Sequence, residues 1–530
     1  MVVPMLVTRF LRRAVKLYAK KTAIVCGAKR FTYAEYGERV NRLSNALGSL
    51  GVKPGDRVAF LGFNCHRLLE AYYGVVQTGA ILVPLNIRLN PADLCYILNH
   101  AGAKVLCVDA ALLHLITPVL DKLETARRFV LMLDGDRPEG NDWPDYESLL
   151  AAAEPEPPAI SVADENDVAE LFYTAGTTGK PKGVMLTHRN LYANAMSFLA
   201  TIQLQDSDVL LHTIPLFHVN GWGTPHALTA VGGTHVVMRQ FQPQRVFELI
   251  EKERVTATAM IPTMVNALLN FPDAGRFDVS SLKRVVIGGA PASVGVVRGV
   301  TEKLGAECLV GYGLSETSPV LAVAYLKSHL QHLPDDQKYA LKAKTGLEAI
   351  GVELRVVNEW GEDVKNDGQE RGEIIARGDV VMKGYWREPE ETDKVIVNGW
   401  LHTGDIATID EESYILIVDR KKDIIITGGE NIAPSEIENA LSSHPAVAEN
   451  SVIGVPDPEW GEIPKALVVL RPGYEVTEQE LIEHCRTKLA RFKVPKSIEF
   501  VDSLPKTPVG KILKNALREK YWAGYDKRVH

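Results

Sequence analysis

The stretch from Tyr173 to Gly183 reads YTAGTTGKPKG, and the rest of the sequence is interpreted outward from it. It combines three glycines with three threonines and two lysines. Glycines let backbone N–H groups converge on an anion, hydroxyls donate further hydrogen bonds, and lysines supply positive charge. It is not a GxxxxGK[ST] P-loop, because Pro181 follows Lys180 and the glycine spacing differs. We therefore predict a phosphate-binding loop of another kind, with a plain surface turn as the alternative.

Apolar runs on both sides of this loop alternate with amphipathic helical segments, which is typical of an α/β fold. The runs cover residues 57–63, 104–108, 209–211, 235–238, 257–261 and 284–287. From 346 to 418 the pattern becomes strand-rich and glycine-punctuated, and two helical patterns follow at 434–443 and 477–489. We expect strands crossed by helices, with the phosphate loop inside the larger part.

The length of 530 residues exceeds what one hydrophobic core usually supports, so we expect at least two domains. The charged cluster 419–423 follows the strand-rich region and is a candidate hinge, with a solvated charge run as the alternative. We predict a large domain over residues 1–419 and a small one over 420–530.

Composition narrows the functional classes. Apolar residues make up 46% and charged residues 24%, as in an ordinary globular protein. The net charge of -7 gives no basic field, so we expect no nucleic-acid partner. We also expect no membrane span, no signal peptide and a cytoplasmic location. The six cysteines form no CxxC pair, which argues against a zinc site.

Two further motifs have a chemical reading of their own. In 312–317, Tyr312 offers a stacking face for a base, Ser315 a hydroxyl for phosphate, and Glu316 a hard oxygen ligand for Mg²⁺. A capped helix N-terminus is the structural alternative. Asp405 follows Thr403 and Gly404, so its carboxylate is suited to two adjacent ribose hydroxyls or is an ordinary turn aspartate.

These motifs, with Gly288-Gly289-Ala290 between them and residues 505–511 (PKTPVGK) near the end, resemble in type and order those of the adenylate-forming superfamily. The resemblance spans nearly the whole chain. It implies an α/β fold with a large multi-sheet N-terminal domain, built of αβ layers plus a β-barrel-like part, and a small, mobile α+β C-terminal domain. It also implies ATP, Mg²⁺ and coenzyme A as cofactors or co-substrates, and a homodimer.

The resemblance implies a role for each matching residue. The residues implied to bind ATP or AMP are Thr174, Gly176, Thr177, Thr178, Lys182, Gly289, Ala290, Gly311, Tyr312, Gly313, Asp405 and Arg420. By the same resemblance, Thr174 and Glu316 hold the metal, the catalytic residue Ser315 contacts the α-phosphate, and Asp405 binds the ribose with help from Arg420. Lys422 is the pivot of the small domain, whereas Gly428 and Gly429 face CoA.

Lys511 has a chemical reason for its implied catalytic role. The attacking carboxylate, with a reference pKa of roughly 4, is already ionised and needs no general base. Adenylation instead needs positive charge that bridges the carboxylate and the α-phosphate oxygens. Lys511 and Mg²⁺ would supply it, and a domain rotation would then expose the acyl-adenylate to the CoA thiol.

The segment 215–222 (PLFHVNGW) resembles the acyl-pocket stretch of fatty-acyl-CoA synthetases, with His218, Val219 and Trp222 as substrate or gate residues. Core packing is the alternative for this histidine and tryptophan. Small or apolar pocket positions favour an alkyl tail. We expect an acid–CoA ligase for a medium- or long-chain fatty acid. The alternatives are a short thioalkyl or branched acid, an aromatic acid, or an adenylating enzyme without CoA transfer.

Three positions depart from the commonest pattern of the family. Ala175 stands where serine is frequent, Ser315 where threonine is frequent, and Ile426 where several members have a second lysine. The first change keeps the loop small and the second keeps the hydroxyl. The third removes a lysine that would otherwise be a candidate for a role in the second half-reaction or in nucleotide binding.

Overall fold

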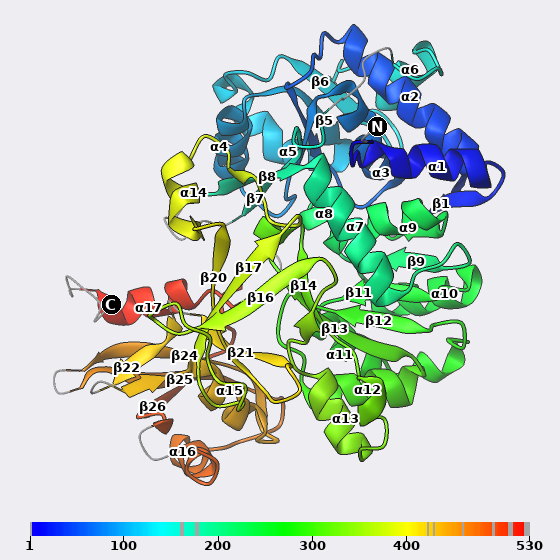
Figure 1. Cartoon of the computed structure of the whole chain (residues 1–530). Helices are drawn as coiled ribbons and strands as arrows, with labels where there is room; N and C mark the ends of the chain where they lie inside the picture. Colours follow the sequence, from blue (N-terminus) through cyan, green and yellow to red (C-terminus); the bar gives the residue numbers. More distant parts are fainter. Residues whose placement is uncertain are drawn as a thin grey trace. The chain divides into compact units, whose positions relative to one another are not determined.

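The computed structural model describes residues 3–158, 164–174, 180–420, 423–427, 430–457, 460–489, 493–506 and 512–523. The chain divides into two compact units. Unit 1 comprises Met1–Leu354 and Ala376–Leu401, and unit 2 comprises Arg355–Ile375 and His402–His530. The domain boundary expected between residues 419 and 420 stays a prediction. Figure 1 shows the course of the chain.

A sheet of nine strands among the described residues forms one layer of unit 1, and its centre is parallel. In spatial order the strands are β15 (Leu347–Glu348), β14 (Val320–Ala324), β13 (Glu307–Gly313), β12 (Arg284–Ile287), β11 (Ala257–Met260), β9 (Val209–His212), β10 (Thr234–Val237), β1 (Thr22–Cys26) and β2 (Lys29–Thr32). The central strands are short runs of buried apolar residues, as expected where helices cover both faces.

A second sheet of unit 1 carries the predicted phosphate loop. Its described strands, in spatial order, are β18 (Gly384–Tyr385), β8 (Lys182–Thr187), β7 (Val168–Thr174), β4 (Ile81–Pro84), β3 (Arg57–Leu61), β5 (Ala103–Asp109) and β6 (Arg128–Met132). All six predicted apolar runs are confirmed as strands, namely β3, β5, β9, β10, β11 and β12. The loop connects β7 to its antiparallel neighbour β8.

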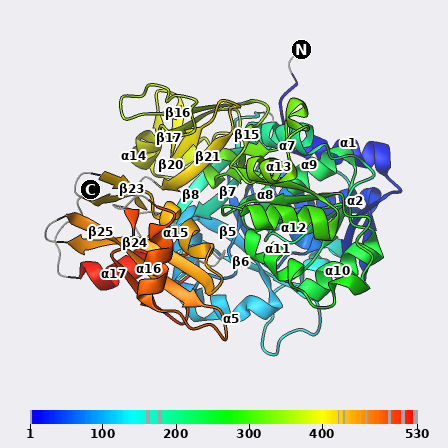
Figure 2. The same cartoon turned by 90° about the horizontal axis from the view of Figure 1, so that it is seen from below.

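Helices separate and flank the two sheets (Figures 1 and 2). In unit 1 they are α1 (Thr8–Tyr18), α2 (Tyr33–Ser49), α3 (His66–Gly74), α4 (Pro91–Ala101), α5 (Leu113–Ile116), α6 (Tyr146–Ala152), α7 (His188–Ile202), α8 (Val219–Trp222), α9 (Thr224–Val231), α10 (Pro243–Glu253), α11 (Pro262–Leu269), α12 (Val294–Leu304), α13 (Asp335–Lys342) and α14 (Pro389–Val395). Buried residues of α10, α11 and α12 pack on one face of the nine-stranded sheet. Helices α2, α3, α7 and α9 contribute to the core between the sheets, and α4 covers the outer face of the second sheet. The expected αβ layering is therefore confirmed.

The start of α7 shows how local sequence fixes an element beside the loop. Thr187 ends β8 and caps α7, because its hydroxyl accepts a hydrogen bond from the Asn190 N–H at 3.2 Å. In return, the Thr187 N–H donates to the Asn190 side-chain oxygen Oδ1 at 2.8 Å. This reciprocal cap satisfies backbone groups that would otherwise lack partners, and so sets where the strand gives way to the helix.

The third sheet lies in the region predicted to be strand-rich, and the fourth sheet lies after it in the chain. The third is half-barrel-like and contains β16 (Val352–Val357), β17 (Gly372–Gly378), β20 (Trp400–Ile409), β19 (Ile396–Val397) and β21 (Ile415–Arg420). The fourth, in unit 2, contains β23 (Glu430–Ile432), β22 (Ile425–Thr427), β25 (Gly461–Leu470), β24 (Val447–Asp457) and β26 (Ser497–Phe500). Helices α15 (Pro434–Ser442) and α16 (Glu478–Arg486) pack on the fourth sheet, with α17 (Lys514–Trp522) beside β24. The two helical patterns predicted there are confirmed.

Buried histidines are an unusual feature of the unit 1 core. The His212 Nε2 and His235 Nδ1 atoms lie 2.9 Å apart, and the His235 Nε2 lies 3.0 Å from the Thr229 hydroxyl. Burial lowers the pKa of His212 to about 3, lowers the pKa of His188 to about 4, and holds the pKa of His235 well below its ordinary value. These imidazoles are therefore neutral in the folded chain at neutral pH.

This burial predicts acid sensitivity. Each folded-state pKa lies below the unfolded value of roughly 6.5, so the unfolded chain takes up protons first as the pH falls. These histidines therefore do not reduce the free energy of unfolding above about pH 6.5. Below that pH each of them lowers it, by about 2 kcal/mol at pH 5. Urea unfolding followed by tryptophan fluorescence between pH 8 and pH 5 measures this slope.

The variant His188→Asn should flatten the pH dependence, whatever it does to stability at pH 8, because one depressed pKa is removed. The control His329→Gln replaces an exposed histidine and should leave the slope unchanged. A slope that is the same in wild type and His188→Asn would contradict this account.

Candidate active site

The hairpin of β7 and β8 presents the predicted phosphate loop. Thr174, the last residue of β7, pairs with Lys182, the first residue of β8. Antiparallel pairing therefore fixes both ends of the loop. The predicted residues Gly176, Thr177 and Thr178 lie outside the described residues. Lys180, just after the gap, places its ammonium 5.5 Å from the ring centre of Tyr96.

Lys182 is buried rather than solvated. Its ammonium forms an ion pair with Glu391 of α14 and lies 5.1 Å from the ring centre of Tyr385. Hydrogen bonding from Lys182, with a second bond from Lys394, lowers the pKa of Glu391 to about 2. Lys182 is thus held by an ion pair on one side and by the ring of the buried Tyr385 on the other.

Glu316 lies on the short 3₁₀ helix η5 (Ser315–Thr317), directly after β13 and its Tyr312. The Tyr385 hydroxyl donates to Glu316 Oε1 at 2.9 Å, and the Met382 N–H donates to the Glu316 carbonyl at 2.8 Å. Burial raises the pKa of Tyr385, so it remains a hydroxyl donor. The sequence analysis missed both Tyr385 and Glu391. The only local signal for Tyr385 is its place between a glycine and a tryptophan.

Trp222 meets the predicted adenine-binding residues. A methyl group added at Gly289 would lie 3.1 Å from the Trp222 indole and 3.3 Å from Ile261, and one at Gly288 would lie 3.2 Å from the indole. The indole therefore covers the backbone of Gly288 and Gly289. This close approach requires glycine at both positions, because a Cβ atom would crowd the ring. The structure brings the predicted gate residue and predicted nucleotide-binding residues together.

The segment that carries Trp222 has an unusual backbone. Val219 has φ 33° and Trp222 has φ 63°, both in the left-handed region that side chains disfavour. Such strain persists where surrounding packing enforces it, and it often accompanies function. Val219 is buried and His218 is half-buried. Val219 and Trp222 are thus the first and last residues of the one-turn helix α8, and both have strained backbone.

In unit 2, Asp405 of β20 pairs through its backbone with Arg420 of β21, and its side chain is buried. Glu373, which sequence reasoning missed, fixes the turn before Asp405. Its Oε1 accepts from the Gly404 N–H at 3.0 Å, and its Oε2 lies 3.1 Å from His402 Nδ1. Gly404 needs its glycine here because φ is 70°. The result is a rigid loop presenting one buried carboxylate.

The Arg420 side chain is not described, and Lys422, Gly428, Gly429 and Lys511 lie outside the described residues. Beside the predicted hinge, Asp423 is buried and accepts from Arg518 of α17 at 2.6 Å. Burial by itself would lower the pKa of Lys514, but the nearby carboxylates of Glu438, Asp419 and Asp423 outweigh this effect and raise it. The C-terminal helix therefore anchors one end of that hinge through charge.

Unit 1 also contains a cavity of about 600 Å³. Its lining is mostly apolar, and the residues are Phe63, Asn64, Ile87, Arg88, Leu112, Thr213, Pro215, Phe217, Met238, Arg239, Gln240, Phe241, Ile261, Thr263 and Met264. Phe217 precedes the gate segment, and Ile261 contacts the same glycine as Trp222. The cavity therefore adjoins the predicted gate, and its volume falls within the range of about 300–1,000 Å³ found for ligand pockets.

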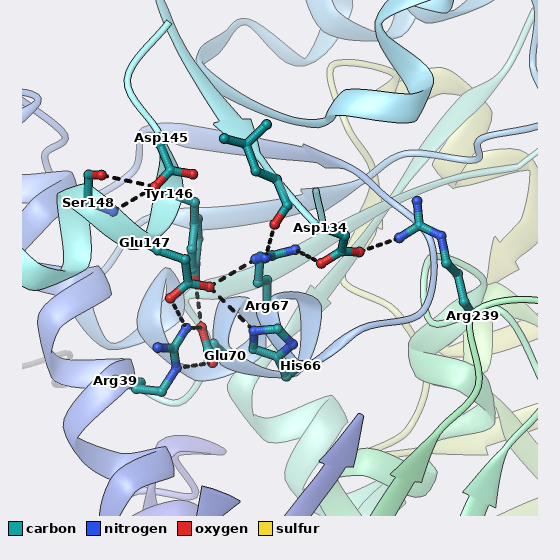
Figure 3. A network of polar contacts seen from close by, with 11 residues as sticks. Arg39, His66, Arg67, Glu70, Asp134, Asp145, Tyr146, Glu147, Ser148 and Arg239 are labelled. Atoms are coloured by element: carbon teal, nitrogen blue, oxygen red, sulfur yellow. Dashed lines mark hydrogen bonds and ion pairs between the residues drawn. The ribbon is translucent and has the colours of Figure 1, made fainter. Parts of the chain in front are cut away.

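Arg239, which lines the cavity, belongs to a network of polar contacts (Figure 3). Its guanidinium donates to Asp109 at 2.9 Å and to Asp134 at 2.6 Å, and lies 4.2 Å from the Phe63 ring centre. Asp134 also accepts from Arg67, a fully buried side chain that bonds Glu147 as well. A buried guanidinium without such partners would be strongly destabilising. The network thus fixes the position of Arg239.

Further members complete the network in Figure 3. Arg39 of α2 forms ion pairs with Glu70 at 2.6 Å and Glu147 at 2.9 Å, and the Tyr146 hydroxyl donates to Glu70 at 2.7 Å. Burial works against ionisation, yet hydrogen bonding to His66 and the charge of Arg39 hold the pKa of Glu147 below its usual range. Helices α2, α3 and α6 are therefore joined by ion pairs.

A nucleoside triphosphate with Mg²⁺ fits the donors of unit 1. Mg²⁺ usually takes one or two carboxylates, keeps several waters and binds substrate phosphates. Glu316 supplies one hard carboxylate and Thr174 a hydroxyl, and within the described residues there is no cluster of three or more His, Cys, Asp or Glu that could hold a metal alone. Both residues are donors of the kind that Mg²⁺ accepts alongside substrate phosphates.

Comparison with known proteins agrees with this chemistry. Residues 11–386 match the AMP-binding enzyme family, and residues 436–511 match the AMP-binding enzyme C-terminal domain. These matches define the class as adenylate-forming enzymes. The chain belongs to the AMP-binding enzyme family.

Relatives cover nearly the whole chain. It is 42% identical over 521 residues to a long-chain-fatty-acid–CoA ligase of Thermus thermophilus, covering 97% of this chain and 95% of that protein. It is 40% identical over 511 residues to a feruloyl-CoA synthase of Amycolatopsis sp, covering 96% and 98%. A solved anthranilate CoA ligase in complex with anthranoyl-AMP has a TM-score of 0.87 at 27% identity, with 98% of both chains covered.

The chain is an AMP-forming acid–CoA ligase that uses ATP, Mg²⁺ and CoA. It converts a carboxylic acid to an acyl-adenylate and then to a thioester. None of the described helices combines the length and the hydrophobicity that crossing a bilayer requires.

The turn before Glu316 gives a test of the site geometry. A Cβ at Gly313 would lie 1.6 Å from the Pro319 carbonyl oxygen, which is backbone and cannot rotate away. Gly313→Ala should therefore displace η5 and its Glu316, and lower kcat for pyrophosphate release by roughly 100-fold.

The matched control is Gly48→Ala in α2, where an added Cβ meets nothing within 4 Å. It should keep full activity, and by helix propensity it should be neutral or slightly stabilising. Wild-type kinetics for Gly313→Ala would show that this loop does not set the catalytic geometry.

Proposed function

We propose that the ligase activates a medium- or long-chain fatty acid. The observation that carries this proposal is the mostly apolar cavity of about 600 Å³ beside the gate segment. No acidic residue is among its described lining residues, so no carboxylate there is available to pair with a substrate ammonium group. Each methylene buried in such a cavity contributes about 0.8 kcal/mol, which favours long alkyl chains.

Trp222 is the proposed gate between this cavity and the nucleotide. Its indole covers Gly288 and Gly289, next to Ile261 on the cavity wall. The left-handed backbone at Val219 and Trp222 gives the segment a strained state from which it can change conformation on acid binding. His218 and Val219 line the passage.

The residues proposed to bind the nucleotide are those implied by the family resemblance. Gly289, Ala290, Gly311, Tyr312 and Gly313 frame the adenine. The loop from Thr174 through Gly176, Thr177, Thr178 and Lys182 holds the phosphates. Ser315 contacts the α-phosphate, Thr174 and Glu316 hold Mg²⁺, and Asp405 with Arg420 binds the ribose. The buried, rigidly held Asp405 carboxylate supports this last assignment.

A rotation of the C-terminal domain, residues 420–530, is proposed to separate the two half-reactions. Lys511 neutralises charge during adenylation, Lys422 is the pivot, and Gly428 and Gly429 face the CoA arm. The Asp423–Arg518 ion pair supports a firmly anchored pivot end. We also place the enzyme in the cytoplasm as a homodimer, which cell fractionation and light scattering would test.

An aromatic acid is the second candidate. The relative that is 40% identical and named feruloyl-CoA synthase favours it. Phe63, Phe217 and Phe241 in the cavity lining would stack on an aromatic ring. A short thioalkyl or branched acid would leave most of the cavity unfilled and is less favoured.

The substrate class can be tested by a pyrophosphate-release screen over saturated acids of graded length, ferulate, cinnamate and a thioalkyl acid. We expect kcat/KM to rise with chain length and to favour long acids over ferulate by about 10-fold or more, because a few extra buried methylenes suffice for that ratio. Thioester formation with CoA is followed in parallel. A maximum at ferulate or cinnamate would replace the fatty-acid proposal with the aromatic one.

The gate assignment predicts the effect of Trp222→Ala. Removing the indole should change the ratio of kcat/KM between long and medium acids by roughly 10-fold and leave the KM for ATP nearly unchanged. The control Trp360→Ala removes a tryptophan that is 75% exposed and should leave the chain-length profile as in wild type. An unaltered profile in Trp222→Ala would count against the gate.

A further inference from the structure

Tyr385 links two parts of the proposed ATP site that lie far apart in the sequence. It belongs to β18, which pairs antiparallel with β8, placing Tyr385 opposite Val184. The side chain is only 8% exposed, and its hydroxyl donates to Glu316 Oε1 at 2.9 Å. Within the described part of the chain, no other side chain bonds that carboxylate.

The backbone around Tyr385 is held on both sides. The Lys383 N–H donates to the Met185 carbonyl at 3.0 Å and the Trp386 N–H to the Gly183 carbonyl at 2.7 Å, which fixes the segment on β8. The Met382 N–H donates to the carbonyl of Glu316 at 2.8 Å. One short segment therefore fixes both the backbone and the carboxylate of Glu316.

The ring of Tyr385 is also fixed from the side of the phosphate loop. Lys182, whose backbone pairs with Thr174, lies 5.1 Å from the ring centre and is ion-paired to Glu391. The Tyr385 N–H donates to the Thr392 hydroxyl of the same helix α14 at 2.8 Å. A cation over a buried aromatic face is attractive, so the ammonium and the ring hold each other.

We infer that Tyr385 is a positioning residue for the metal: it holds Glu316 through Oε1 so that Oε2 is turned to bind Mg²⁺ of MgATP. Through Lys182 it also ties this carboxylate to the phosphate-loop hairpin. The inference rests on the proposed function, because it takes Glu316 to bind the metal. Partners that orient a ligating carboxylate typically change metal affinity by 10- to 100-fold when removed.

The test is Tyr385→Phe, which removes one hydroxyl and keeps the ring over Lys182. Mn²⁺ is titrated calorimetrically into the enzyme saturated with α,β-methylene-ATP, and the Mg²⁺ dependence of pyrophosphate release is measured in parallel. We expect the dissociation constant for the metal to rise by roughly 10- to 100-fold. The KM values for the acid and for CoA should be unchanged.

The matched control is Tyr36→Phe, another buried tyrosine of unit 1, whose hydroxyl donates to the Leu69 carbonyl at 2.8 Å. Removing a hydroxyl whose role is only structural lowers the melting temperature without changing the affinity for the metal. This is the result expected for Tyr36→Phe. An equally unchanged metal constant in Tyr385→Phe would overturn the inference.

Glu316→Gln and the double variant separate this inference from the proposed function. If Glu316→Gln weakens metal binding and Tyr385→Phe weakens it no further in the double variant, the two residues act through one contact. If Glu316→Gln weakens it and Tyr385→Phe alone has no effect, only the inference fails. If Glu316→Gln leaves the metal constant unchanged, the assignment of the metal to Glu316 is wrong.

Discussion

The pairing of β8 with a strand on each side is the constraint on which the proposed site depends. β7 fixes the two ends of the phosphate loop, and β18 brings Tyr385 against the same strand. Backbone pairing is directional, so the register that aligns Thr174 with Lys182 also sets which residues of 382–386 reach Glu316. A slip of one residue would turn Tyr385 to the opposite face of the sheet and leave Glu316 without its partner.

Charge burial imposes the second constraint, and the chain meets it by pairing. Arg67 and Glu70 are fully buried, and each is bonded to opposite charges from other elements. Such networks contribute little net stability, because desolvation offsets much of their attraction, but they fix geometry since an unpaired member would be costly. Arg239 thereby keeps one orientation on the cavity wall. Asp423 and Arg518 play a similar part in unit 2.

Much of the fold could be predicted because its central strands are short runs of apolar residues that few other structures would bury. Residues 284–287 and 257–261 are examples, and both appear as strands within one residue of the expected ends. Strand β18 could not be found in this way, since two residues carry no periodicity. The bond from Tyr385 to Glu316 spans 69 positions, and the ion pair from Lys182 to Glu391 spans 209, so no local pattern signals either contact.

The sequence by itself predicted the class of reaction, because its glycine-rich loop and the motifs around Glu316 and Asp405 resemble those of the adenylate-forming superfamily in type and order. Only the tertiary structure decided how these groups are held. It placed Trp222 over Gly288 and Gly289, formed a cavity lined mostly by apolar residues beside them, and gave Glu316 a tyrosine partner. The physical reason is that partners and cavities arise where segments distant in the chain pack together, and packing depends on the shapes of all of them at once.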